Sequence, residues 1–336
     1  MQNINKAAQY YASMENPPKL AKAWADHGNY FTWHSTVPEN AHFGPLDIFT
    51  ITAGNPANPA ILFLHGYPTS SFDFYALFDD LSQDYYVCAF DAPGYGFSSK
   101  PQHGYRYQIR DDARLADYWI QEVLKLDTFA LFTHDKGDSV GLALLELIQQ
   151  KQTQSYQITH HFIANGNMYL PLAQLTSFQK QILDPETGPI MSSKLQGSVL
   201  AQGLAATTYD TILTQEDIAS HASIFDYEEG VRVQHNVIQY LNQRAQFENG
   251  WLEALQKSDS PTTLLWGEHD TISPLQVADY VYQTCLKDKP NSAYWRLAKA
   301  NHYLLHDEPH VVASIVRQAL QGGDLEGFSQ ERVYRV

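Results

Sequence analysis

Residues 128–150, TFALFTHDKGDSVGLALLELIQQ, decide the fold of this chain. The stretch begins with a short apolar run, residues 129–132, of the length of a buried strand, and ends with a longer one, residues 140–148, that predicts a helix. Only a short, mostly polar segment separates the two runs. A strand that turns this sharply into a helix exposes one side chain above the sheet, beside the helix N-terminus. Asp135 occupies that position, so we expect a nucleophile elbow with an aspartate at its apex.

The composition describes a chain with a large core and an acidic surface. Its 336 residues could form one large α/β domain or two smaller ones, and an apolar fraction of 44% supplies the core. The net charge of -15 disfavours nucleic acid and anionic membranes, which attract clustered Lys and Arg. There is no signal-peptide-like apolar segment at residues 1–20 and no apolar run near the roughly 18 residues of a membrane span. Cys88 and Cys285 are too few for a disulfide framework or a cysteine-rich metal site. We therefore expect a soluble, cytoplasmic protein without nucleic-acid or membrane partners.

Strand-like and helix-like segments alternate along much of the chain. Two antiparallel edge strands are expected first, at residues 30–36 and 46–53. The further predicted strands are residues 60–64, 85–90, 129–132, 158–164, 262–266 and 292–297, and the predicted helices outside the elbow are residues 109–126, 274–286 and 309–320. Strands that alternate with helices form a parallel sheet with right-handed crossovers, so the sequence predicts an α/β fold with a mostly parallel sheet.

The alternation stops between residues 169 and 258, where the segments are helix-like and rich in Gln, Tyr and Leu. A helical insertion in such a sheet is typical of a cap over the C-terminal strand edge, where ligands bind. The predicted division is an N-terminal helical extension (residues 1–28), a core (residues 29–168 and 259–321), a helical cap (residues 169–258) and a polar tail (residues 322–336).

Three candidate catalytic residues follow strand ends. Asp135 lies at the elbow, Asp270 follows the strand predicted at residues 262–266, and His302 follows the strand predicted at residues 292–297. Nucleophile, acid and histidine is the chain order of an α/β-hydrolase triad. Any one of these residues could be a loop cap or a surface charge, and it is their shared placement and order that favour a triad.

Ser139 is a second possible nucleophile, because the residues at 137–141, GDSVG, fit the G-x-S-x-G pattern of serine hydrolases. Its position is seven residues after Phe132, one turn into the predicted helix, whereas Asp135 is three residues after Phe132, at the turn. A tight turn also favours small residues two positions either side of its apex, and Thr133 and Gly137 flank Asp135 in this way. The register favours Asp135, with a serine-type esterase through Ser139 as the alternative.

The chain resembles the epoxide hydrolase and haloalkane dehalogenase branch of the α/β-hydrolases, which uses an aspartate nucleophile and an H-G-x-P oxyanion loop. The resemblance covers about residues 30–321. The segments HGYPTSS (residues 65–71), THDKGD (residues 133–138) and LNQR (residues 241–244), with Phe247 and Trp251, further resemble the mesoderm-specific transcript family.

The resemblance implies a two-step hydrolysis of a small-molecule substrate, without a metal or an organic cofactor. Asp135 would attack an electrophilic carbon and form an alkyl-enzyme ester, and His302, oriented by Asp270, would activate water against that ester. The backbone N–H groups of Tyr67 and Lys136 would hold the oxyanion. A carboxylate suits the first step because it is already ionised at pH 7.

Two departures from the branch concern the substrate. Lys136 stands where haloalkane dehalogenases typically carry a Trp that holds the halide, and Tyr67 stands where many carry Asn. Both changes count against haloalkanes. Lys136 could pair with an anionic substrate, as an Arg does in haloacetate dehalogenases, or could turn toward a neighbouring carboxylate.

Epoxide hydrolases use cap tyrosines to protonate the opening ring, but Gln243 stands where one is expected, with Tyr240 nearly a turn away. The candidate substrate-contacting residues are His65, His134, Tyr209, Tyr227, Tyr240 and Gln243, of which the tyrosines could equally be cap packing. Epoxide hydrolysis is the leading expectation. The alternatives are dehalogenation of a haloalkane or haloacid, ester hydrolysis, and a non-catalytic binding protein on the same fold. The sequence does not indicate the oligomeric state.

Overall fold

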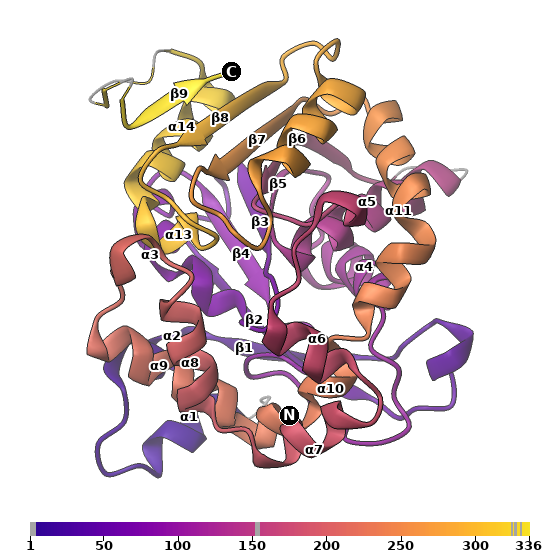
Figure 1. Cartoon of the computed structure of the whole chain (residues 1–336), viewed down its shortest axis with the longest axis vertical. Coiled ribbons are helices and arrows are strands. Elements are labelled where there is room, and N and C mark those ends of the chain that lie inside the picture. Colours follow the sequence, from indigo (N-terminus) through magenta and orange to yellow (C-terminus); the bar gives the residue numbers. More distant parts are fainter. Residues whose placement is uncertain (1–4, 152–154, 324, 326–327, 330) are drawn as a thin grey trace.

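The computed structural model describes residues 5–151, 155–323, 325, 328–329 and 331–336 (Figure 1). Residues 1–4 of the predicted N-terminal extension and residues 324, 326–327 and 330 of the predicted tail lie outside this described part.

Nine strands among the described residues form one sheet, in the order β1-β2-β4-β3-β5-β6-β7-β8-β9 (Figure 1). The strands are β1 (Asn29–Trp33), β2 (Leu46–Ala53), β3 (Ala60–Leu64), β4 (Tyr86–Phe90), β5 (Thr128–His134), β6 (Gln157–Ala164), β7 (Thr262–Gly267), β8 (Ala293–Leu297) and β9 (Val333–Arg335). The pairs β1–β2, β2–β4 and β8–β9 are antiparallel, and the remaining neighbours are parallel. The mostly parallel sheet predicted from the alternation is therefore confirmed.

Continuous apolar runs form the central strands because both faces of the sheet are covered. In β3, Ile61 and Phe63 contribute to one buried apolar cluster, whereas Leu62 and Leu64 contribute to another. Successive side chains of a strand point to opposite faces, so each cluster lies on its own side of the sheet. A strand buried on both faces reads as an unbroken apolar run, as residues 60–64 do.

Helices from the segments between strands cover the two faces (Figure 1). Helices α4 and α5 contribute to the cluster that contains Leu62, and helices α3 and α14 to the cluster that contains Phe63. The helices and short helical turns outside the β6–β7 connection are α1 (Lys6–Ala12), α2 (Lys19–His27), η1 (Pro38–Asn40), η2 (Ser71–Phe74), α3 (Tyr75–Leu81), α4 (Ile109–Tyr118), η3 (Trp119–Leu124), α5 (Lys136–Gln150), α12 (Leu275–Val281), η7 (Tyr282–Leu286), α13 (Leu304–Asp307) and α14 (Pro309–Gln321).

The connection from β6 to β7 contains helices and short helical turns and, among its described residues, no strand, as predicted for residues 169–258. It comprises η4 (Leu170–Leu172), α6 (Ser177–Leu183), α7 (Thr187–Lys194), α8 (Gly197–Ala205), η5 (Tyr209–Thr211), α9 (Gln215–Asp226), η6 (Tyr227–Val233), α10 (Gln234–Val237) and α11 (Tyr240–Lys257). Helix α11 runs alongside α5 (Figure 1), and its Trp251 and Leu255 join the same apolar cluster as α5. The cap as a separate domain stays a prediction.

Helix α2 packs against α9, and Tyr11 of α1 forms a hydrogen bond with Ser223 of α9 at 2.8 Å. The backbone N–H of Leu20 donates to Glu216 at 3.1 Å and that of Ala21 donates to the hydroxyl of Ser220 at 3.3 Å. Glu216 and Ser220 are one helical turn apart, so one face of α9 is turned toward residues 6–27.

Three sequence expectations are modified. Strand β2 lies between β1 and β4 rather than at an edge. Each helix predicted at residues 109–126 and 274–286 is an α-helix that continues as a π-helical segment, η3 or η7. No element was predicted in the tail, but it contains β9, which pairs with β8. This strand forms through its hydrogen bonds with β8 and has no clear strand pattern of its own.

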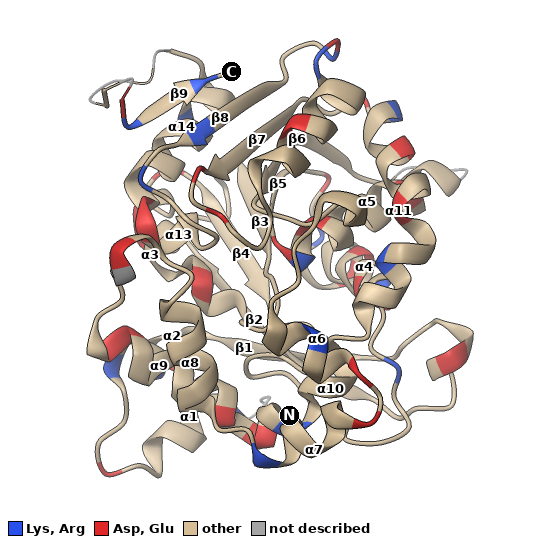
Figure 2. Ribbon diagram, viewed as in Figure 1, with Lys and Arg blue, Asp and Glu red and all other residues tan. Residues whose placement is uncertain are grey.

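Charged residues are spread over many separate elements, with Asp and Glu more frequent than Lys and Arg (Figure 2). Among the described residues, no helix combines the length and the apolar character that crossing a bilayer requires.

Candidate active site

The elbow forms as the sequence predicts. Strand β5 ends at His134 and helix α5 begins at Lys136, which leaves Asp135 between them with φ 51° and ψ -114°. Backbone in this region is strained for a residue with a side chain, by about 1–3 kcal/mol. Gly137 allows the turn to close, because a Cβ at this position would lie 2.1 Å from the carbonyl oxygen of Leu64.

The loop after β3 passes directly over Asp135. A Cβ on Gly66 would lie 2.7 Å from the Cβ of Asp135, so only glycine permits this approach. The next residue, Tyr67, donates its backbone N–H to Oδ2 of Asp135 at 2.7 Å. One of the two predicted oxyanion donors is thus in contact with the predicted nucleophile.

The three predicted triad residues come together. His302 Nε2 lies 3.6 Å from Oδ1 of Asp135, and His302 Nδ1 lies 2.9 Å from Oδ2 of Asp270. The side chains are 2%, 7% and 0% exposed for His302, Asp135 and Asp270 respectively, so their charges interact with little solvent screening.

These contacts control the protonation of His302. Burial alone would lower the pKa of its imidazole, but the negative charges of Asp270 and Asp135 outweigh burial and raise the pKa to about 10. Burial opposes ionisation of Asp135 as well, yet the hydrogen bond and charge of His302, with Arg244, hold the pKa of this carboxyl well below its usual range. The resting site therefore contains an Asp135 carboxylate and a protonated His302 at pH 7.

Asn165, which the sequence did not single out, positions Asp270. Its Nδ2 donates to Oδ2 of Asp270 at 2.6 Å, and its Oδ1 accepts the backbone N–H of Gly267 at 3.1 Å. The other oxygen of Asp270 accepts the N–H groups of Ile272 and Ser273, each at 2.8 Å. Asn165 has φ 50°, a conformation that Asn tolerates better than most residues, and this is the local signal for its role.

Lys136 is turned toward a neighbouring carboxylate, one of the two possibilities considered from the sequence. Its ammonium forms a buried ion pair with Asp112 of α4 and lies 4.5 Å from the ring centroid of Tyr95. Burial nevertheless raises the pKa of Asp112 to about 6, against the lowering effect of Lys136. The charge of Lys136 is therefore already compensated within the protein.

Ser139 lies in the first turn of α5, where its Oγ accepts a hydrogen bond from Nε of Arg244 at 2.8 Å. Arg244 is 1% exposed, and its Nη2 has no partner among the described residues. The sequence identified Arg244 only as part of a motif. Its four-residue spacing from Tyr240 on α11 is the signal that it shares the face of that residue.

Tyr240 is the cap tyrosine that lies at the site. Its ring centroid is 5.8 Å from that of Tyr67, and burial together with the charge of Asp135 raises the pKa of its phenol, which stays protonated. Gln243, by contrast, accepts the backbone N–H of Arg110 at 3.3 Å. Gln243 lies on the same helix, three residues after Tyr240, and a role for it at the substrate stays a prediction.

The other two tyrosines make packing contacts. Tyr227 packs its ring at 5.2 Å from that of Phe97 and under the ammonium of Lys100. Tyr209 packs its ring 4.9 Å from that of His269. Neither set of contacts includes Asp135, so the packing alternative describes them better.

The two candidate histidines form hydrogen bonds with backbone groups near the triad. His65 contacts the carbonyl of Gly66 at 2.8 Å through Nδ1, and its Nε2 accepts the N–H of Ala92 at 3.0 Å. Burial lowers its pKa, so the ring is neutral. His134 donates from Nε2 to the carbonyl of His302 at 2.8 Å.

A cavity of about 310 Å³ adjoins the triad. Its walls are Tyr67, His302 and Tyr303 on the core side, and residues of α6 and α8, including Phe178, on the cap side. The lining is mainly apolar, and of the three triad residues His302 contributes to it.

Comparisons with known proteins agree with the fold. Residues 59–151 match a family described as alpha/beta hydrolase fold. The epoxide hydrolase CorEH superposes with a TM-score of 0.68 at 18% identity, covering 88% of this chain and 99% of that one. The haloalkane dehalogenase DbeA-M1 loop variant from Bradyrhizobium elkanii gives a TM-score of 0.67 at 19% identity, covering 88% and 97%. The chain has the α/β-hydrolase fold.

Among proteins of known sequence, its relatives include the mesoderm-specific transcript homolog protein of Bos taurus, 27% identical over 77% of this chain and 76% of the relative. Epoxide hydrolase 4 of Mus musculus is 24% identical over 79% of this chain and 74% of the relative. Together the matches support a hydrolase of this fold, with an epoxide hydrolase among its sequence relatives and an epoxide hydrolase and a haloalkane dehalogenase variant among the proteins of similar fold.

Proposed function

We propose that the chain hydrolyses small, apolar epoxides through a covalent ester on Asp135. The observation that carries the proposal is the unequal engagement of the two carboxylate oxygens. Oδ2 accepts the N–H of Tyr67 at 2.7 Å, whereas Oδ1 faces His302 Nε2 at 3.6 Å. Oδ1 is the oxygen available to attack the epoxide. Oδ2 would carry the negative charge when the ester is hydrolysed, and the N–H of Tyr67 already donates a hydrogen bond to it.

In the first step, Oδ1 of Asp135 forms a bond to an epoxide carbon while the ring C–O bond breaks. The departing oxygen takes the hydroxyl proton of Tyr240, whose phenol is held protonated beside Asp135. Ester formation removes the negative charge of Asp135, which is one of the two charges that raise the pKa of His302. The pKa of His302 therefore falls, and its proton restores that of Tyr240 by way of solvent.

In the second step, neutral His302 accepts a proton from water, and the resulting hydroxide attacks the ester carbonyl carbon. The oxyanion forms on Oδ2, next to the N–H of Tyr67. Its collapse breaks the carbonyl–Oδ1 bond, and the diol leaves after taking a proton from His302. The new carboxylic acid of Asp135 then returns its proton to His302, which regenerates the resting ion pair.

The cavity supports an apolar substrate of modest size. About 310 Å³ lies beside Tyr67 and His302, with Phe178, Leu200 and Leu204 on the cap side. A pocket of this size and lining suits a small organic molecule. The ion pair of Lys136 with Asp112 argues against use of Lys136 to bind an anionic haloacid. The hydrogen bond from Arg244 to Ser139 similarly argues against a free serine nucleophile.

The test is intact-protein and peptide mass spectrometry on His302→Gln, incubated separately with epoxides, haloalkanes, haloacids and esters. Without its base the enzyme should stall as the ester, so the peptide that contains Asp135 should gain the mass of the whole epoxide. The alkyl mass without halogen would instead establish dehalogenation.

Two matched variants control this experiment. The double variant His302→Gln/Asp135→Asn should form no adduct, whereas His302→Gln/Ser139→Ala should form the same adduct as His302→Gln. An acyl group on Ser139, or an adduct that survives Asp135→Asn, would overturn the proposed nucleophile.

A further inference from the structure

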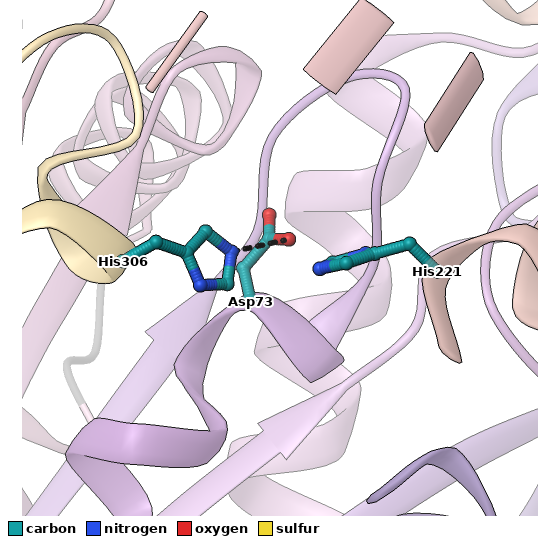
Figure 3. Close-up of side chains that lie close together, drawn as sticks. All are labelled: Asp73, His221 and His306. Carbon is teal, nitrogen blue, oxygen red and sulfur yellow. Dashed lines mark ion pairs between the residues drawn. The ribbon is translucent and has the colours of Figure 1, made fainter. Parts of the chain in front are cut away.

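Three buried side chains from distant parts of the chain converge outside the triad: Asp73 of η2, His221 of α9 and His306 of α13 (Figure 3). One ligand atom of each, Asp73 Oδ1 and Nε2 of both histidines, remains without a hydrogen-bond partner among the described residues. The residues are 1%, 2% and 8% exposed respectively. Buried polar atoms are rarely left unpaired, so three that face one another require an explanation.

The spacing of these atoms suits a shared ion better than direct hydrogen bonds. His306 Nε2 lies 3.7 Å from Asp73 Oδ1, beyond hydrogen-bond length, and all three atoms lie within 4.8 Å of one another. A tetrahedral ion with bonds of 2.0–2.2 Å separates its ligand atoms by about 3.4 Å. Small side-chain rotations would therefore bring the three atoms to one ion.

The donor set is that of a divalent transition metal. Two imidazole nitrogens and one carboxylate oxygen are typical ligands of Zn²⁺ and its first-row neighbours, whereas Ca²⁺ and Mg²⁺ prefer oxygen ligands throughout. The second oxygen of Asp73 accepts the hydroxyl of Thr69, which orients the carboxylate as outer contacts of metal ligands commonly do.

We propose that Asp73, His221 and His306 form a binding site for a divalent first-row transition metal, with Zn²⁺ as the probe ion. Asp73 lies in the short helix after the 65–71 loop, and His306 is four residues after His302. His221 comes from the helical connection that lines the cavity. An ion at this position would link α9 to η2 and α13, the two short helices that follow the segments with Tyr67 and His302. It is separate from the proposed epoxide chemistry, which requires no metal.

The experiment uses the full chain without a histidine tag, stripped with chelator and titrated with Zn²⁺ against a chromophoric competitor. We expect one Zn²⁺ per chain and a higher thermal unfolding midpoint with the ion bound. Substitution with Co²⁺ should give the visible absorption of a low-coordinate site with nitrogen and oxygen ligands.

Variants locate the ion. His221→Gln and His306→Gln should each weaken Zn²⁺ binding by about 100-fold. Asp73→Asn keeps the shape of the side chain and should also weaken Zn²⁺ binding. It replaces a histidine variant in the test if that variant fails to fold. His302→Gln, which removes the triad histidine, and His42→Ala, which removes an exposed one, should bind as the wild type does. No stoichiometric binding to the wild type would overturn the proposal, as would binding that is lost in His302→Gln but retained in His221→Gln.

Discussion

Replacing Lys136 with Met removes the positive charge beside Asp112 and should destabilise the folded chain. The two side chains are 4% and 8% exposed. Removing one partner of a buried ion pair costs about 3–5 kcal/mol, because the other charge stays buried without compensation. Asp112 can avoid part of this cost by taking up a proton, since burial has raised its pKa to about 6 even with Lys136 present. We therefore expect a loss of about 2–4 kcal/mol in the free energy of unfolding at pH 7.

The sign of the pH dependence follows from Asp112. Loss of Lys136 raises the folded-state pKa of this carboxyl further above its unfolded value. An acid with a raised folded-state pKa contributes stability that is present below its unfolded pKa and is lost as pH rises through the folded pKa. The difference between wild type and Lys136→Met should therefore be smaller at pH 5 than at pH 7.

Urea unfolding followed by tryptophan fluorescence measures this free energy. The double variant Lys136→Met/Asp112→Asn removes both charges and should recover most of the loss, with a coupling energy of about 2 kcal/mol or more. A Lys136→Met variant within about 0.5 kcal/mol of wild type would refute the reasoning, because surface substitutions behave in that way. The reasoning would also be refuted if the loss of unfolding free energy in the double variant equalled the sum of the losses in the two single variants.

Three further predictions concern the elbow, the leaving group and the triad. Gly137→Ala puts a Cβ 2.1 Å from a backbone carbonyl oxygen and should greatly lower the midpoint of thermal unfolding. Gly203→Ala, in open space on α8, should leave this midpoint equal or higher. Equal midpoints for the two variants would contradict the prediction. Tyr240→Phe should lower kcat on an epoxide by about 10²–10⁴-fold and Gln243→Leu by no more than about two-fold, so comparable rates for the two variants would exclude Tyr240 as the proton donor. The pKa of His302 is raised from 6.5 to about 10, so its contribution to stability is complete below pH 6.5 and is lost as pH rises through 10. The thermal midpoint should therefore fall more steeply between pH 7 and pH 10 in wild type than in His302→Gln, and parallel curves would count against the ion pair.

The sequence predicted those features that depend on local pattern and chain order. A five-residue apolar run marks β3, and the abrupt change from a strand period to a helix period marks the elbow at Asp135. Asp270 and His302 could be found because the carboxyl ends of parallel strands share one edge of the sheet. Their convergence follows from the topology without any knowledge of side-chain contacts.

The sequence could not predict partners that come from separate elements. Asp112 on α4 pairs with Lys136, and Arg244 on α11 contacts Ser139, only because those helices flank α5. The choice between Tyr240 and Gln243 depends on the rotation of α11 about its axis, which its starting residue and packing determine. Strand β9 could not be predicted either, because three residues are too few to show a strand pattern and the strand is held by its hydrogen bonds with β8.

The packing of residues 6–27 on α9 has a consequence for how substrate reaches the cavity. Helix α9 is anchored by the hydroxyl of Tyr75, which donates to Asp217 at 2.9 Å, and by α2, whose Ala21 N–H donates to Ser220 at 3.3 Å. Helix α8, which packs against α9, forms one wall of the cavity, and helix α6, which buries only Ile182, forms another. The less anchored wall should move more readily, so we expect substrate to enter beside α6, while α9 holds α8 in place. Deleting α1 and α2 would remove this anchor of α9. The α8 wall should then move as well, and the cavity should admit bulkier molecules.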